Sequence, residues 1–234
     1  MPRPLLAPAL VAVTLILAAC GSSAKGVPGA RTTTTASTST SSHTPAARDS
    51  AGCLAVGRPA PKGPEHLSRP HATLSAARTY TVTLQTNCGP IVIRLDVSRA
   101  PKTASSVASL VRRGFYDHLT FHRIVPGFVI QGGDPLGTGL GGPGYTLVER
   151  PPSTLKYTRG VVAMAKTQSE PSGTSGSQFF IVTAKNAGLP AQYALVGRVL
   201  SGLGTVAKIS AEPTDAQGAP GSPVVIEKAT LSER

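Results

Sequence analysis

Residues 116–133 read YDHLTFHRIVPGFVIQGG, and this stretch decides the fold. Its apolar and β-branched residues predict two short strands, Leu119–Arg123 and Val129–Gly132, joined by a Pro-Gly turn. Each predicted strand carries one polar side chain among apolar neighbours, Arg123 in the first and Gln131 in the second. An isolated arginine and an isolated amide at such positions make this hairpin a candidate for a functional site.

A second stretch, residues 176–182, repeats this theme with the sequence GSQFFIV. Alternation along a strand places Gln178 and Phe180 on one face, just as it places Val129 and Gln131 together in the earlier strand. An arginine and two glutamines beside aromatic side chains predict a shallow apolar site with a few fixed hydrogen-bond donors. The alternative is that these are ordinary solvated side chains on amphipathic strands.

Outside these two stretches, period-two patterns and two helical patterns cover most of the remaining chain from residue 80 onward. Turn residues between the elements predict a mainly β fold, a barrel or sandwich with helical caps. The remaining strands are expected at Tyr80–Thr86, Ile91–Leu95, Gly160–Ala165, Gln178–Thr183, Ala194–Leu200 and Val224–Leu231, and the helices at Ala100–Gly114 and Leu203–Ser210.

Length and composition exclude several classes of protein. The 234 residues suffice for one ordinary domain with extensions. There is no Trp and there are only 5 Tyr and 5 Phe, which leaves too few aromatic rings for a stacking platform that binds single-stranded nucleic acid. The net charge of +12 is spread along the chain, which favours anionic surfaces in general over a nucleic-acid partner. The three Cys and the His and carboxylate residues are not spaced for a metal.

The N-terminus reads as an export signal. Arg3 precedes an apolar stretch, residues 5–19, that is too short to span a bilayer. Residues 17–21 read LAACG, which resembles the bacterial lipobox, where cleavage precedes a cysteine that is then acylated. We therefore expect a lipoprotein signal peptide over 1–19 and an exported protein anchored to the outer face of the bacterial cell membrane by lipidated Cys20. Plain secretion with an incidental cysteine is the alternative.

Two regions follow the signal. Residues 20–71 are rich in Ser, Thr and Pro and offer little apolar surface, which predicts a flexible stalk. Residues 72–234 hold the predicted strands and helices and form the expected domain. In an exported protein Cys53 and Cys88 are candidates for a disulfide that ties the end of the stalk to the domain, and two reduced thiols are the alternative.

The stretch 116–133 resembles the signature of the cyclophilin family almost end to end. Met164-Ala165 and residues 176–180 resemble the second block of that family, and the resemblance covers about residues 78–234. It implies a closed eight-stranded antiparallel β-barrel capped by two α-helices. It also implies peptidyl-prolyl cis-trans isomerase activity on X-Pro segments without a cofactor, and we expect a monomer.

Carried over position by position, the resemblance implies that Arg123 is the catalytic arginine and that Gln131 holds it. It further assigns the walls of a proline pocket and of a substrate groove. The pocket residues are Phe128, Val129, Phe180 and Leu189, and the groove residues are Ala165 and Gln178.

Three positions depart from the family pattern. Lys166 stands where Asn is common, although that contact is usually made by the backbone, and Tyr193 stands where many members have His. Gly188 replaces a Trp that many members carry. We expect Lys166 and Tyr193 still to line the substrate site, and His122, which points away from Arg123 along its strand, to be structural.

Two functions fit these features. The first is an isomerase that assists the folding of exported proteins by stabilising the twisted X-Pro amide. The second is a cyclophilin-like binding module that grips Pro-containing segments with little turnover, because a fold alone does not establish catalysis. The arginine, glutamine and phenylalanine at 123, 131 and 180 favour the first.

Overall fold

The computed structural model describes residues 46–234. The expected signal peptide, Cys20 and the first part of the expected stalk lie outside the described residues. Within 46–234, no helix combines the length and the hydropathy that crossing a membrane requires.

Nine strands form one antiparallel sheet, and two short strands pair separately. The helices are α1 (Pro101–Arg112) and α2 (Leu203–Ser210). The strands of the large sheet are β1 (Tyr80–Thr86), β2 (Gly89–Leu95), β3 (Leu119–Thr120), β4 (Arg123–Val125), β5 (Val129–Gly132), β7 (Val161–Met164), β9 (Phe179–Val182), β10 (Leu195–Ser201) and β11 (Val225–Glu233). The separate pair is β6 (Leu147–Val148) and β8 (Thr174–Ser175).

The large sheet curls, because its two edges come from adjacent pieces of chain. Its order is β3-β11-β1-β2-β10-β7-β9-β5-β4, and only Phe121 and His122 separate the edge strands β3 and β4. The single strand expected at Leu119–Arg123 is therefore divided, since its first part pairs with β11 and its second part pairs with β5. This division gives nine strands instead of eight, and the expected closed eight-stranded barrel is not confirmed.

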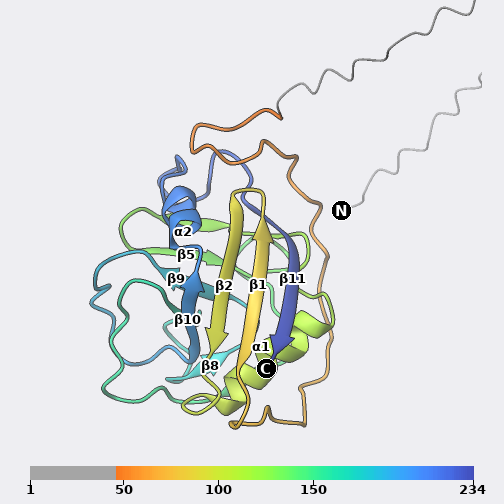
Figure 1. The fold of residues 1–234 in the computed structure, drawn as a ribbon, viewed down its shortest axis with the longest axis vertical. Helices are drawn as coiled ribbons and strands as arrows, with labels where there is room; N and C mark the ends of the chain where they lie inside the picture. Colours follow the sequence, from red (N-terminus) through yellow and green to blue (C-terminus); the bar gives the residue numbers. More distant parts are fainter. Residues whose placement is uncertain (1–45) are drawn as a thin grey trace, which may run out of the picture. The chain divides into compact units, whose positions relative to one another are not determined.

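The β1–β2 hairpin follows the predicted alternation. Val82 pairs with Ile93 and Leu84 pairs with Ile91, and all four side chains are buried. Residues between them on β1 are half-buried or exposed, so the hairpin presents one apolar face to the core. Figure 1 shows this hairpin beside β11 and β10.

Helix α1 packs against β10 and β11 and contributes to the same core. Pro101 occupies its first turn, where a missing N–H costs no hydrogen bond. Its buried side chains include Leu110 and Val111, and the chain leaves the helix through Gly114 at a φ of 66°. The helix is thus slightly shorter at both ends than the expected Ala100–Gly114.

Two apolar clusters stabilise the domain. The larger fills the inside of the curled sheet, with Phe121, Ile124 and Ile181 fully buried. The smaller one lies around Phe180 and Val129 and is separate from it. Because neighbouring residues on one strand point to opposite faces, Ile181 and Phe180 belong to different clusters. The smaller cluster is the one that underlies the candidate site.

Residues 54–79, which we call the strap, run along the surface of the domain to the start of β1 (Figure 1). At its beginning, Cys53 and Cys88 form a disulfide, the pairing favoured from the sequence. Lys62 and Leu67 donate backbone hydrogen bonds to the domain. The disulfide and these hydrogen bonds attach part of the segment expected as a stalk to the domain.

Candidate active site

Arg123, Gln131 and Phe180 lie in one row across three neighbouring strands. Arg123 of β4 is the register partner of Gln131 of β5, and Gln131 is the partner of Phe180 of β9. Directly opposed residues of an antiparallel pair share a face, so the three side chains lie on the same side of the sheet. The row continues through Ala163 and Leu195, which are buried. It therefore runs from a half-buried cationic end to a buried apolar end.

The backbone around Arg123 is held by the loop after α2. Ile124 donates its N–H to the carbonyl of Gly218 at 2.7 Å. Gly218 has a φ of 87°, and a Cβ there would lie 3.3 Å from Cγ of Arg123 and 2.9 Å from the carbonyl oxygen of Ile124. A close backbone approach of this kind needs glycine, and it brings the loop against the aliphatic stem of Arg123. None of the four ion pairs within residues 46–234 includes Arg123.

Gln131 forms its hydrogen bond to a second glutamine. Its Nε2 donates to Oε1 of Gln178 at 3.0 Å, and Nε2 of Gln178 donates to the carbonyl oxygens of Gly139 and Gly141 at 2.8 and 2.9 Å. In the described residues 46–234, no hydrogen bond joins the side chains of Gln131 and Arg123. Gln131 therefore does not hold Arg123 by such a bond. Gln131 instead lies beside Arg123 and connects it, through Gln178, to the loop that begins after Asp134.

Asp134 orders that loop. It is 2% exposed, and its carboxylate accepts the N–H groups of Leu136, Thr138 and Gly139. A Cβ at Gly141 would lie 2.0 Å from Oδ1 of Asp134, so the loop can close around the carboxylate only with glycine there. Sequence reasoning missed Asp134. A lone aspartate followed by glycines and Thr138 is a turn signal that could have found it.

The residues assigned to the proline pocket come together in the smaller apolar cluster. Phe180 and Val129 are buried at its centre, and the Phe180 ring meets the Tyr193 ring edge-on, with centroids 5.4 Å apart. Phe128, Ala165 and Leu189 are partly buried against the same cluster. Partly buried apolar side chains around a buried ring form a wall that a small apolar ring can contact.

Tyr157 supports this wall and was also missed. Its hydroxyl donates to the carbonyl of Tyr193 at 2.6 Å and accepts the N–H of Tyr193 at 2.9 Å. Burial raises the pKa of Tyr157 to about 12, so the hydroxyl stays protonated and keeps its donor. The side chain thereby fixes the backbone at Tyr193. No periodic pattern marks Tyr157, because it lies in an irregular segment.

A groove of about 310 Å³ adjoins the row on the side of Gln178. One wall comes from residues 139–143, and another comes from Ala165 to Thr167 and Glu170. Lys166 folds back over its own loop, since its Nζ donates to the carbonyls of Thr167 and Glu170 and lies 5.7 Å from the centre of the Tyr193 ring. Its ammonium therefore marks the boundary between the groove and the apolar wall.

Two neighbouring positions complete the site. Gly188 has a φ of 66°, and a Cβ there would meet nothing within 4 Å, so the space of a larger side chain is open.

His122 lies between β3 and β4, half-buried. Burial lowers the pKa of His122, and the charge of Arg123 lowers it further while Asp134 opposes both. A neutral imidazole next to Arg123 adds no second positive charge to the site.

Comparison with known proteins identifies what this arrangement resembles. Residues 81–231 match the family model described as cyclophilin type peptidyl-prolyl cis-trans isomerase/CLD. Peptidyl-prolyl cis-trans isomerase-like 1 of Gibberella zeae is 38% identical over 159 residues, which cover 66% of this chain and 96% of that protein. Peptidyl-prolyl cis-trans isomerase A of Mycobacterium tuberculosis is 38% identical over 177 residues, which cover 68% and 96%.

A solved structure is similar over the same part of the chain. It is a cyclophilin type peptidyl-prolyl cis-trans isomerase of Cryptosporidium parvum, crystallised in the presence of the dipeptide Ala-Pro. The TM-score is 0.61 at 33% sequence identity, and the match covers 65% of this chain and 98% of the other.

Proposed function

Because this chain belongs to the cyclophilin family and is a peptidyl-prolyl cis-trans isomerase, we propose that Arg123 is its catalytic residue and that exported polypeptides are its substrates. The observation that carries the first part is the row of Arg123, Gln131 and Phe180. The side chain of Arg123 lies in one row with Phe180, which is at the centre of an apolar wall that suits a proline ring. The partners that fit this site are X-Pro segments of polypeptides, and their isomerisation needs no cofactor.

The reaction is a rotation about one amide bond. Rotation removes the amide resonance, so the carbonyl gains double-bond character and the nitrogen regains a lone pair. A donor aimed at that nitrogen binds the twisted amide better than either planar isomer, which lowers the barrier. Arg123 supplies this donor, and no bond to carbon forms or breaks.

The remaining site residues hold the two ends of the substrate. The proline ring packs on Phe180, with Phe128, Val129 and Leu189 around it. The residues before proline lie along the groove between Ala165 and the loop at 139–143. Gln131 and Gln178 keep the guanidinium side and the loop side of the site in register.

Export is supported by the chemistry of the described residues as well as by the N-terminal sequence. A disulfide such as Cys53–Cys88 persists in oxidising compartments and is rare in the reducing cytosol. Together with the expected lipobox, it favours a monomeric isomerase tethered to the outer face of the cell membrane by acylated Cys20. Substrates would then be chains that emerge from the export machinery.

The deciding experiment measures isomerisation of an Ala-Pro peptide by the wild-type domain, Arg123→Ala and Arg94→Ala. Arg94 is an exposed arginine on β2 and serves as the matched control. We expect Arg123→Ala to lower kcat/KM by roughly 10²–10³, the cost of one preorganised donor, and Arg94→Ala to leave it unchanged. A folded Arg123→Ala protein with normal turnover contradicts the catalytic role. Peptide binding without turnover by the wild type would favour the binding-module alternative.

A further inference from the structure

We propose that the strap positions the substrate groove: it holds the loop 135–146 in place, and the Cys53–Cys88 disulfide keeps the strap attached. This inference rests on the proposed function, because it takes the groove beside Arg123 as the substrate site. The strap lies N-terminal to the matched range 81–231, so the family comparison assigns it no role.

Three hydrogen bonds join the strap to the loop. Lys62 donates its backbone N–H to the carbonyl of Pro135 at 2.9 Å, and Leu67 donates its own to the carbonyl of Pro143 at 2.8 Å. The Arg69 guanidinium donates to the carbonyl of Thr146 at 2.8 Å. One contact falls at the beginning of the loop and two fall near its end, so the strap holds both ends of the loop.

The closest approach is at Gly144. A Cβ on Gly144 would lie 2.5 Å from the carbonyl oxygen of Glu65 and 2.7 Å from Cα of His66. The two backbones therefore pack with no room for a side chain, and any substituent at 144 must displace the strap. Gly137, in the same loop, also has a positive φ, but a Cβ there would meet nothing within 4 Å.

The braced loop leads directly to the catalytic row. Its residues 139–143 line the groove, and the carbonyls of Gly139 and Gly141 accept hydrogen bonds from Gln178. Gln178 in turn accepts from Gln131, the register partner of Arg123. A continuous set of contacts thus connects the strap to the row through groups whose positions decide how the substrate fits.

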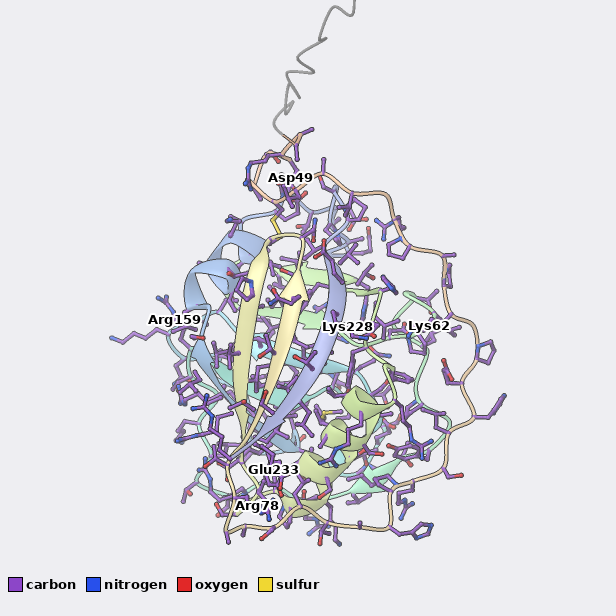
Figure 2. The ribbon with its side chains drawn as sticks, turned by 45° about the vertical axis from the view of Figure 1, so that its right-hand side comes forward. Asp49, Lys62, Arg78, Arg159, Lys228 and Glu233 are labelled. Atoms are coloured by element: carbon purple, nitrogen blue, oxygen red, sulfur yellow. A yellow bond between two sulfur atoms is a disulfide. The ribbon has the colours of Figure 1, made fainter. Side chains whose placement is uncertain are left out.

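The strap is anchored at several points along its own length. The disulfide fixes its start to the β1–β2 turn, and Leu54 there exchanges hydrogen bonds with Asn87. Midway, the Lys62 ammonium donates to the carbonyls of Gly114 and Phe115. Figure 2 shows Lys62 on the strap, between Asp49, which precedes the strap, and Arg78 near its end. Its end continues into β1. Reduction of the disulfide removes one covalent anchor and leaves the others.

A loosened loop must be ordered again each time substrate binds. The free energy of ordering the loop is added to the bound ground state and to the transition state alike, so KM rises while kcat is unchanged. Loss of fold would instead reduce the amount of active enzyme and lower kcat. The split between KM and kcat therefore distinguishes a positioning role from a merely structural one.

The test compares Gly144→Ala with Gly137→Ala in the full chain. Both place alanine in a left-handed conformation in the same loop, and only the first collides with the strap. We expect Gly144→Ala to raise KM for an Ala-Pro peptide roughly 2- to 30-fold, the range for substitutions that modulate coupling between sites, with kcat unchanged. Gly137→Ala should leave KM unchanged. Equal KM values in the two variants overturn the proposal.

Amide exchange provides a readout that does not depend on turnover. The N–H groups of Thr138 and Gly139 bond to Asp134, and their exchange reports the order of the loop. Faster exchange in Gly144→Ala than in Gly137→Ala supports the positioning role of the strap. This holds even if the wild type shows no turnover, because absent turnover would overturn only the proposed function. Equal exchange rates in both variants overturn the proposal that the strap positions the loop.

The disulfide gives a second variant in case Gly144→Ala fails to fold. Because the other anchors of the strap remain, we expect the Cys53→Ser/Cys88→Ser protein to show a smaller rise in KM than Gly144→Ala, and a reductant to raise KM of the wild type to the level of the double variant. The double variant should not respond to reductant. A wild-type KM that is indifferent to complete reduction contradicts the role of the disulfide.

Discussion

Gln178 is the residue through which Gln131 reaches the loop: it accepts from Nε2 of Gln131 at 3.0 Å and donates to two loop carbonyls. The side chain of Gln178 therefore fixes the distance between the guanidinium side of the site and the groove wall. A single amide can do this because it offers both a carbonyl acceptor and two donors. The same relationship makes Gln178 sensitive to any change of its hydrogen-bonding groups.

We expect Gln178→Glu to be more harmful than its similar size suggests. A carboxylate cannot donate to the carbonyls of Gly139 and Gly141, and it leaves both acceptors facing a negative charge. Removing such a bond costs about 1–3 kcal/mol, so kcat/KM should fall roughly 5- to 150-fold. The matched control is Gln85→Glu on the exposed face of β1, which should have normal kinetics. Wild-type kinetics in Gln178→Glu would show that this bridge does not matter.

The row that carries the site could be predicted from the sequence, because it depends on local pattern. Alternation in 129–132 and 178–183 fixes which side chains share a face, and the resemblance to cyclophilins supplies the pairing between these strands. The break at Phe121 and His122 could not be predicted. It arises because one segment serves both edges of the sheet, which is a property of the curled topology and not of the local residues.

The position of the strap could not be predicted from the sequence, for a different reason. Its Pro-rich and polar composition predicted a flexible stalk, and residues 54–79 contain no helix and no strand of the two sheets. Its position depends instead on single N–H groups, such as that of Leu67, meeting carbonyls more than 70 positions away in the chain. Such contacts leave no periodic signal. Only the cysteine pair, 35 residues apart, marked one of its anchors in the sequence.

Arg123→Lys tests whether the guanidinium or merely its charge is needed. A lysine keeps the positive charge but replaces a planar set of donors by a flexible ammonium. We expect it to recover little of the activity lost in Arg123→Ala, and we expect both variants to keep the thermal midpoint of the wild type to within a few degrees. Isomerisation and thermal unfolding are measured on the same preparation. Substantial recovery by lysine would mean that charge alone suffices.

Acylation of Cys20 is a proposal that can be tested by partitioning. The protein isolated from a bacterial host that processes lipoproteins should enter the detergent phase, because a lipid chain contributes about 0.8 kcal/mol per buried CH₂. Cys20→Ser should move it to the aqueous phase, whereas Cys53→Ser should not. Equal partitioning of Cys20→Ser and wild type would instead favour plain secretion.

The pH dependence of stability should carry a contribution from His122. Burial lowers the pKa of this imidazole below its ordinary value of 6.5. The unfolded chain therefore binds the proton more readily, and the free energy of unfolding falls as the pH drops below about 6.5. Each unit by which the pH falls below 6.5 lowers the free energy of unfolding by at most about 1.4 kcal/mol, until the folded-state pKa is reached.

Urea unfolding at pH 7.5 and 5.5 measures this contribution. We expect the wild type to lose more stability than His122→Gln over that interval, since glutamine binds no proton. His71→Gln, at an exposed position on the strap, is the matched control and should follow the wild type. If His122→Gln and wild type lose stability in parallel, the imidazole is not held neutral beside Arg123. A steeper loss in the His122→Gln variant than in the wild type would mean that the folded state favours the protonated ring, the opposite of what burial between β3 and β4 requires.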